Sequence, residues 1–73
     1  MPYDYSKLVG RIKEFFGSQK EFAKAIGLSE RSVSLKMNGE VGWKQQEISK
    51  ACEALKLEVH QIAEYFFAIK VQY

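Results

Sequence analysis

The side chains that could carry out bond-making chemistry are few, and they form no set. His60 is the only histidine and Cys52 the only cysteine of the 73 residues. Cys52 stands at helical spacing from Ile48 and Leu55, which predicts a small buried hydrophobe, and His60 is expected on the surface of a helix. No glycine-rich phosphate loop or nucleophile elbow is present, and metal binding would need more ligands. We therefore expect no enzyme, no metal and no cofactor.

The side chains that could form specific hydrogen bonds gather instead in residues 19–37, QKEFAKAIGLSERSVSLKM. Within this segment Ala23 is small where a second helix would have to approach closely. Gly27 can adopt the positive φ that ends a helix, and Val33 returns to the core. This spacing predicts two helices that cross at a short turn, a helix-turn-helix.

The segment resembles the helix-turn-helix of the lambda-repressor and Cro-like (XRE-type) family of small phage and bacterial regulators. The family's pattern is a glutamine that opens the first helix, then an alanine, a glycine and an aliphatic residue, here Gln19, Ala23, Gly27 and Val33. The likeness extends over about residues 5–65. Where the family usually has an apolar residue three places later, this chain has Lys36. The resemblance implies a compact all-α domain of five helices that binds operator DNA with helix 30–37 in the major groove.

Helix geometry predicts which side chains of residues 30–37 face outward. With Val33 in the core and about 100° per residue, the outward side chains are Arg31, Ser32, Ser34 and Leu35. The Arg31 guanidinium matches the O6 and N7 acceptors of guanine, Ser32 and Ser34 could bond bases or phosphates, and Leu35 could contact a thymine methyl group. The alternatives are a solvated Arg31 and, if the helix is rolled, a core Leu35.

A second set of residues is expected to position the protein on the DNA backbone. The resemblance implies that Gln19 touches this backbone or braces the reading helix. Lys36 is predicted on the flank of its helix, where its stem packs while its amine reaches a phosphate. The other candidates lie in or beside the motif: Lys20, Ser29, Asn38 and Lys44. Asn38 could equally be only a turn residue.

The charge is weakly basic and unevenly distributed. The net charge is +2. Residues 1–40 contain seven Lys/Arg and five Asp/Glu, whereas residues 41–73 contain four of each, so the whole excess lies in the half with the motif. Phosphate contacts would then come from a few cations, backbone N–H groups and helix N-termini. On charge alone, an ordinary solvated surface fits nearly as well.

Apolar spacing predicts the other helices. A first helix, begun at Asp4 and ended at Gly17, would bury Leu8, Ile12, Phe15 and Phe16. The motif helices span about 19–26, with a capping box from Ser18 and Glu21, and about 30–37, with Ser29 as N-cap. Trp43 precedes a fourth helix with Lys44 as an unusual cap. Val59, Ile62, Ala63 and Phe66 indicate a short fifth helix.

Residues 66–73 form a tail in which apolar and polar residues alternate, which is typical of a strand. Such a strand could pair with the same segment of a second copy and form a homodimer. The alternative, which we favour, is a tail laid over the core that buries Phe67 and Ile69.

Length and composition predict one globular domain over residues 1–73, at 47% hydrophobic residues. No run is long or apolar enough to span a bilayer, and the N-terminus lacks the pattern of a signal peptide. We expect no membrane association and a location in the cytoplasm of a bacterial host cell. At this size a single core provides only about 3–5 kcal/mol of stability.

Together these features predict a sequence-specific DNA-binding transcriptional regulator, similar to phage Cro-type repressors, that binds double-stranded operator DNA. The alternative is a protein-interaction module on the same scaffold, such as an antirepressor that binds a second phage regulator. Three features favour this alternative: the low net charge, Glu30 at the start of the reading helix, and the apolar Leu35 on its outer face.

Overall fold

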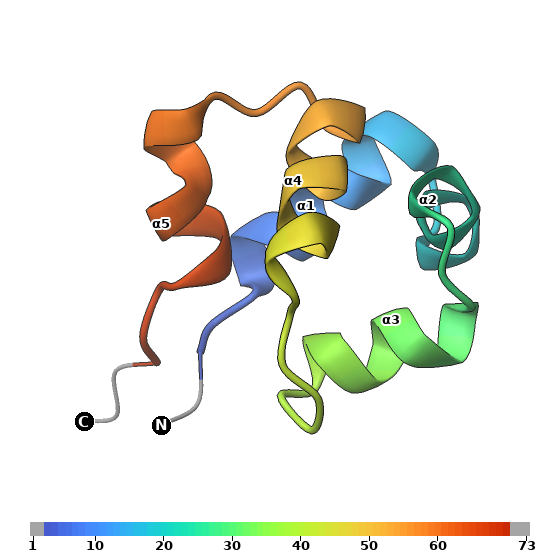
Figure 1. Cartoon of the computed structure of the whole chain (residues 1–73), viewed down its shortest axis with the longest axis horizontal. Helices are drawn as coiled ribbons and strands as arrows, with labels where there is room; N and C mark the ends of the chain where they lie inside the picture. Colours follow the sequence, from blue (N-terminus) through green and yellow to red (C-terminus); the bar gives the residue numbers. More distant parts are fainter. Residues whose placement is uncertain (1–2, 71–73) are drawn as a thin grey trace.

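The computed structural model describes residues 3–70, which form five α-helices and one 3₁₀ turn (Figure 1). The elements in chain order are α1 (Ser6–Phe16), α2 (Gln19–Ile26), α3 (Glu30–Met37), α4 (Gln45–Ala54), η1 (Val59–Gln61) and α5 (Ile62–Phe66). The predicted all-α architecture of five helices is confirmed. None of the helices over 3–70 has the length and apolar character needed to cross a membrane.

The first helix ends at Gly17, as its sequence predicts, but it begins at Ser6 with Tyr5 rather than Asp4 as the N-cap residue. The Asp4 carboxylate accepts hydrogen bonds from the backbone N–H of Ser6 (2.9 Å) and from its hydroxyl (2.6 Å), and Gly17 ends the helix at φ 81°. The prediction that Phe15 is a core residue was wrong. Phe15 is 40% exposed, and the Arg11 guanidinium lies 4.5 Å from the centre of its ring. It lies about 100° round the helix from Phe16, which packs on the core.

The two motif helices have the predicted bounds because their caps are satisfied. The Ser18 hydroxyl accepts the Glu21 N–H at 3.3 Å, and the Ser29 hydroxyl accepts the Ser32 N–H at 3.1 Å. Gly27 is left-handed, with φ 76°, and ends α2. A turn of residues 27–29 therefore joins α2 to α3.

The fourth helix begins at a residue that cannot cap with its side chain. Lys44 is the N-cap residue, and the Glu47 carboxylate accepts its backbone N–H at 2.8 Å. This hydrogen bond, from the Lys44 N–H to the side chain at the third helical position, is one of the two that make up a capping box. Cys52 and Leu55 are buried, as the spacing of this helix predicts.

The core lies where α1, α2, α4 and α5 meet. Helix α1 packs against α2 and α5, and α2 packs against α3 and α4. The large side chains that are fully buried come from α1, α2, α3, α5 and the C-cap of α4: Phe22, Phe66, Leu8, Ile12, Leu55 and Val33. Figure 1 shows α2 and α3 toward one end of the molecule and α5 at the other, with α1 and α4 between them, so the molecule has two separate outer sides.

The segment after α5 runs beside the N-terminal segment of the same chain. The Asp4 N–H donates to the Ala68 carbonyl at 2.7 Å, and Tyr3 and Ile69 form an isolated antiparallel bridge. The prediction that the tail buries Phe67 and Ile69 was wrong, because these side chains are 49% and 54% exposed. Residues 71–73 of the predicted strand lie outside the described residues.

Candidate interaction surfaces

The outer face of α3 is partly as predicted. Arg31 is exposed, and its guanidinium makes no hydrogen bond or ion pair within residues 3–70. Ser32, Ser34 and Leu35 are half-buried. Leu35 is therefore neither an exposed residue nor a core residue, and Arg31 is the one candidate base-contacting side chain on this helix that is exposed.

The prediction that Lys36 reaches a phosphate was wrong. Only 4% of this residue is exposed, and its ammonium contacts the Glu47 carboxylate at 2.9 Å and the Gly42 carbonyl at 3.1 Å. It also lies 5.8 Å from the centre of the Trp43 ring. The lysine points inward because the sequence supplies these three partners for a buried charge, which would otherwise be too costly to desolvate.

The Lys36–Glu47 pair joins α3 to α4. Burial raises the pKa of the Glu47 carboxyl, but the Lys44 N–H and the Lys36 ammonium offset this, so its pKa is lowered overall. Since the side chain of Glu47 is only 14% exposed, its charge is matched inside the protein. The roll of α3 is therefore fixed by a buried ion pair between α3 and α4.

The predicted backbone-contacting residues are distributed over three elements. Lys20 is exposed near the start of α2, Asn38 at the end of α3, and Lys44 at the start of α4. Ser29 is exposed, but its hydroxyl accepts the Ser32 N–H. Gln19 is half-buried, and its buried Oε1 has no hydrogen-bond partner within the described residues.

Cys52 and His60 take the positions that the sequence predicts. The Cys52 thiol is buried, which raises its pKa. His60 is exposed, with Nδ1 4.0 Å from the Glu58 carboxylate. Over residues 3–70 no three His, Cys, Asp or Glu side chains gather as a metal site would require.

One surface feature was not predicted from the sequence. It is an open hollow of about 670 Å³ between α4 and the η1–α5 segment, which we call the α4–α5 groove. Its lining contains no charged side chain and consists of Trp43, Gln45, Ile48, Ser49, Cys52, Leu57, Val59, Ile62 and Phe67.

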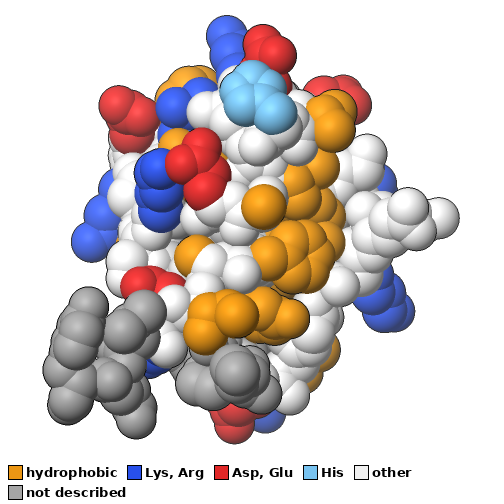
Figure 2. Space-filling model, turned by 90° about the vertical axis from the view of Figure 1, so that its left-hand side faces the viewer, with side chains coloured by type: hydrophobic (Ala, Val, Ile, Leu, Met, Phe, Trp, Pro, Cys, Tyr) orange, Lys and Arg blue, Asp and Glu red, His pale blue; other side chains and the backbone are white. Residues whose placement is uncertain are grey.

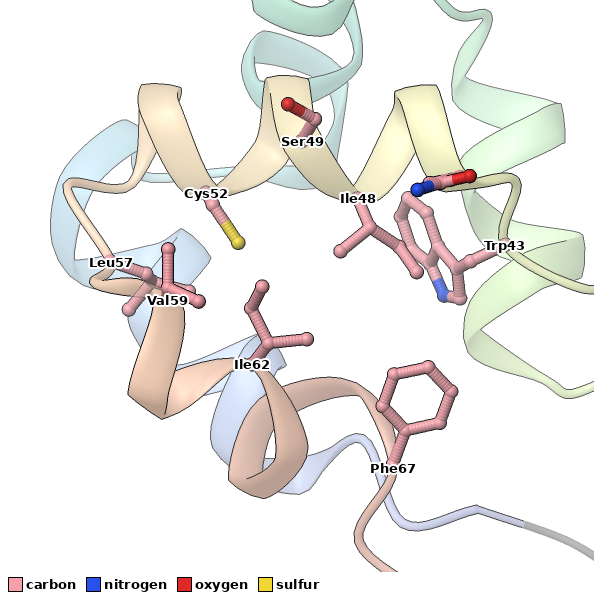
Figure 3. A pocket seen from close by; sticks show the side chains of 9 residues that line it. Trp43, Ile48, Ser49, Cys52, Leu57, Val59, Ile62 and Phe67 are labelled. Atoms are coloured by element: carbon pink, nitrogen blue, oxygen red, sulfur yellow. The ribbon is translucent and has the colours of Figure 1, made fainter.

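Figure 3 shows how this groove is built. Ile48 and Cys52 point into it from α4, and Ile62 points toward them from α5. Trp43 and Phe67 lie together at one end. The indole packs edge-on against Phe66, with ring centres 5.3 Å apart, and its buried N–H has no partner within the described residues. The groove is thus a trough with apolar side chains on both walls.

Apolar residues of the groove are also exposed at its rim. Val59 is 85% exposed, and Phe67 is 49% exposed. Figure 2 shows a continuous hydrophobic stripe on this face of the molecule, with charged side chains mainly beside it. The expected helical face of Val59, Ile62, Ala63 and Phe66 is formed only in part, because Val59 begins a 3₁₀ turn and is mostly exposed. The apolar periodicity of a sequence predicts which residues share a helix face. It does not predict whether other parts of the chain cover that face.

Comparison with known proteins places the chain in a family. A family model described as "Protein of unknown function (DUF739)" matches residues 1–69. The chain belongs to this family. No curated protein matches it.

A solved structure is similar to this member of the family over almost its whole length. It is the solution structure of the modulator of repression (MOR) of the temperate bacteriophage TP901-1 from Lactococcus lactis. The two sequences are 54% identical, the TM-score is 0.81, and the match covers 99% of this chain and 97% of the other. The fold described above is therefore shared with a phage regulatory protein.

Proposed function

We propose that this protein modulates the repression of a phage genetic switch by binding another regulatory protein, in the cytoplasm of the bacterial host. The observation that carries the proposal is the uncharged α4–α5 groove with its exposed rim. A small monomeric protein rarely leaves a contiguous apolar surface without a use. The similarity to a phage protein titled a modulator of repression supports a place in the same kind of switch.

The composition of the groove supports a protein as the partner. Protein interfaces have cores that are poor in charge and rich in aromatic and aliphatic side chains, with a polar rim. Trp43 and Phe67 lie at one end of the groove, and Ile48 and Ile62 face each other across it. Nucleic acid would instead require cations to neutralise phosphates, and the groove lining has none.

A reporter of the switch tests this function. The reporter carries the repressor gene and the operator region of the phage or prophage that encodes this chain, and the protein is supplied in trans. We expect wild-type protein to change reporter expression and Val59→Glu to abolish the change, while Arg31→Ala retains it. Loss with Arg31→Ala together with full activity of Val59→Glu would contradict protein binding through the groove.

A second candidate function is sequence-specific DNA binding, and we propose it on one observation. Helix α3 follows a three-residue turn after α2 and carries an exposed Arg31 with no partner among the described residues. This agrees with the resemblance to Cro-like helix-turn-helix proteins, in which such a helix reads the major groove. The pairing of Lys36 with Glu47 removes one cation from this surface, so the geometry favours this function less.

Selection of duplexes from a random DNA pool tests the second function. If α3 reads bases, the wild-type protein enriches a defined motif. Arg31→Ala should then weaken binding to that motif by about 1–3 kcal/mol and relax preference at one base position. Lys20→Ala is the matched control, because loss of a phosphate contact weakens binding to all sequences alike. No enrichment by the wild-type protein would exclude sequence-specific binding.

A further inference from the structure

We propose that the α4–α5 groove binds one amphipathic α-helix of a different protein, seated along α4. This inference rests on the proposed function, because it names the kind of segment through which the partner regulator is recognised. Three observations support it: the spacing of the lining residues, their lack of charge, and the distribution of exposed hydrophobic residues over the rest of the described chain.

The wall formed by α4 is one side of this helix, on which Cys52 is buried in the core, Ile48 packs partly against it, and Gln45 and Ser49 are exposed. The residues that α4 contributes are Gln45, Ile48, Ser49 and Cys52, at positions i, i+3, i+4 and i+7 of one helix. Residues at this spacing lie on one side over two turns, a length of about 10 Å. Another helix packs against such a face with side chains at the same spacing.

The opposite wall completes a seat for a helix. Val59 and Ile62 are three residues apart and face α4 from η1 and α5. A peptide that binds as an added β-strand would need an exposed sheet edge to pair with, whereas both walls of the groove come from helical segments. The isolated bridge between Tyr3 and Ile69 lies outside the lining.

Charge and surface composition indicate that the helix belongs to another chain. A buried charge on the occupant would find no counter-charge, so its inserted side chains must be apolar. The exposed large hydrophobic residues of this protein are Tyr3, Phe15, Val41, Val59, Phe67 and Ile69. Among the described helices only α1 contributes an exposed one from outside the groove, Phe15, so a second copy has no helical apolar stripe to insert.

The test uses a display library of helix-favouring peptides of about 14 residues, near the length at which isolated helices become stable. Positions i, i+3, i+4 and i+7 are randomised, and a second library with alternating randomised positions represents strands. Trp43 is the only tryptophan and lines the groove, so its fluorescence reports binding by purified full-length protein. Peptides that lack tryptophan are used for the titration.

We expect apolar residues to be selected at the helical positions, with a shift of Trp43 emission on binding. Val59→Glu should weaken these peptides at least about tenfold, and it should not affect folding because Val59 is 85% exposed. The matched control is Phe15→Glu, which replaces an exposed apolar residue outside the groove and should leave peptide affinity unchanged. Circular dichroism verifies the fold of both variants.

Four results would overturn the inference. Selection from the alternating library alone would assign the groove to a strand, and binding unaffected by Val59→Glu would place the peptides elsewhere. Self-association by analytical ultracentrifugation that Val59→Glu abolishes would assign the groove to a second copy. If Val59→Glu abolishes the reporter response while no helical peptide binds, the helix is wrong and the proposed function stands. Without a reporter response from wild-type protein, the proposed function itself fails.

Discussion

The two outer sides of this domain differ in whether their side chains are paired within the chain or left exposed. On the α3 side, a lysine is drawn into the interior and paired with Glu47, and the serine hydroxyls at both helix starts are bonded to backbone N–H groups. On the α4–α5 side, Val59 and Phe67 remain exposed around an apolar groove. The first side pairs these polar groups within the chain, and the second leaves apolar side chains exposed to solvent.

This difference separates residues that hold the fold from residues that are available to a partner. Lys36 lies in the helix where the sequence alone suggests recognition, yet it acts inside the domain. Val59 lies in a segment that suggests a core helix, yet it faces solvent. Substitutions on the two sides should therefore affect different measurements, stability on one side and binding on the other.

The largest effect on stability is expected from Glu47→Ala. It leaves the buried Lys36 ammonium without its counter-charge and also removes the acceptor of the Lys44 N–H. We expect the free energy of unfolding to fall by about 3 kcal/mol, most of the stability available to a domain of this size. Urea unfolding followed by circular dichroism measures the change.

The double substitution Lys36→Met/Glu47→Gln is the control for this effect. It removes both charges, so no unpaired ion remains buried, and it should unfold at a higher urea concentration than Glu47→Ala. If the double variant is the less stable of the two, the cost lies in lost packing, and the ion pair does not brace α3.

A smaller loss is expected from Ser29→Ala, which removes the cap of α3. The Ser32 N–H would lose its 3.1 Å acceptor, at a cost of about 1 kcal/mol of unfolding free energy. Ser29→Asp is the matched comparison, because aspartate also caps and its charge suits a helix N-terminus. Thermal unfolding of both variants measures the effect, and equal losses would show that the cap does not stabilise α3.

Low pH should reduce the stability of the protein by protonating Glu47, the partner of Lys36. The pKa of Glu47 is lowered in the folded protein, so its contribution is present above its unfolded pKa and is lost as the pH falls through the folded value. Below pH 4.5, the ordinary value of this carboxyl, the stability difference between wild type and Glu47→Gln should shrink progressively. Urea unfolding over a pH series measures it, and a constant difference would mean that protonation of Glu47 is not coupled to folding.

The helices could be predicted from the sequence because their signals are local. Ser18, Gly27 and Ser29 determine where α2 and α3 begin and end through contacts within a few residues. The burial of Lys36 could not be predicted in this way, because its ion-pair partner Glu47 lies beyond an irregular loop. The groove was missed for a related reason: apolar spacing marks α4 and the α5 segment as having apolar faces, but only their tertiary placement leaves part of those faces uncovered.

The smallest effect on stability is expected on the open side, from Val59→Ser. Because 85% of Val59 is exposed, its removal should change the free energy of unfolding by less than about 0.5 kcal/mol. The same variant should weaken partner binding, since Val59 lines the groove. Urea unfolding measures the stability of this variant, and the reporter assay measures its partner binding. A loss of binding without a loss of stability distinguishes an interaction surface from a poorly covered core. A large loss of stability would show that Val59 acts as a core residue, and the contrast between the two sides would then be wrong.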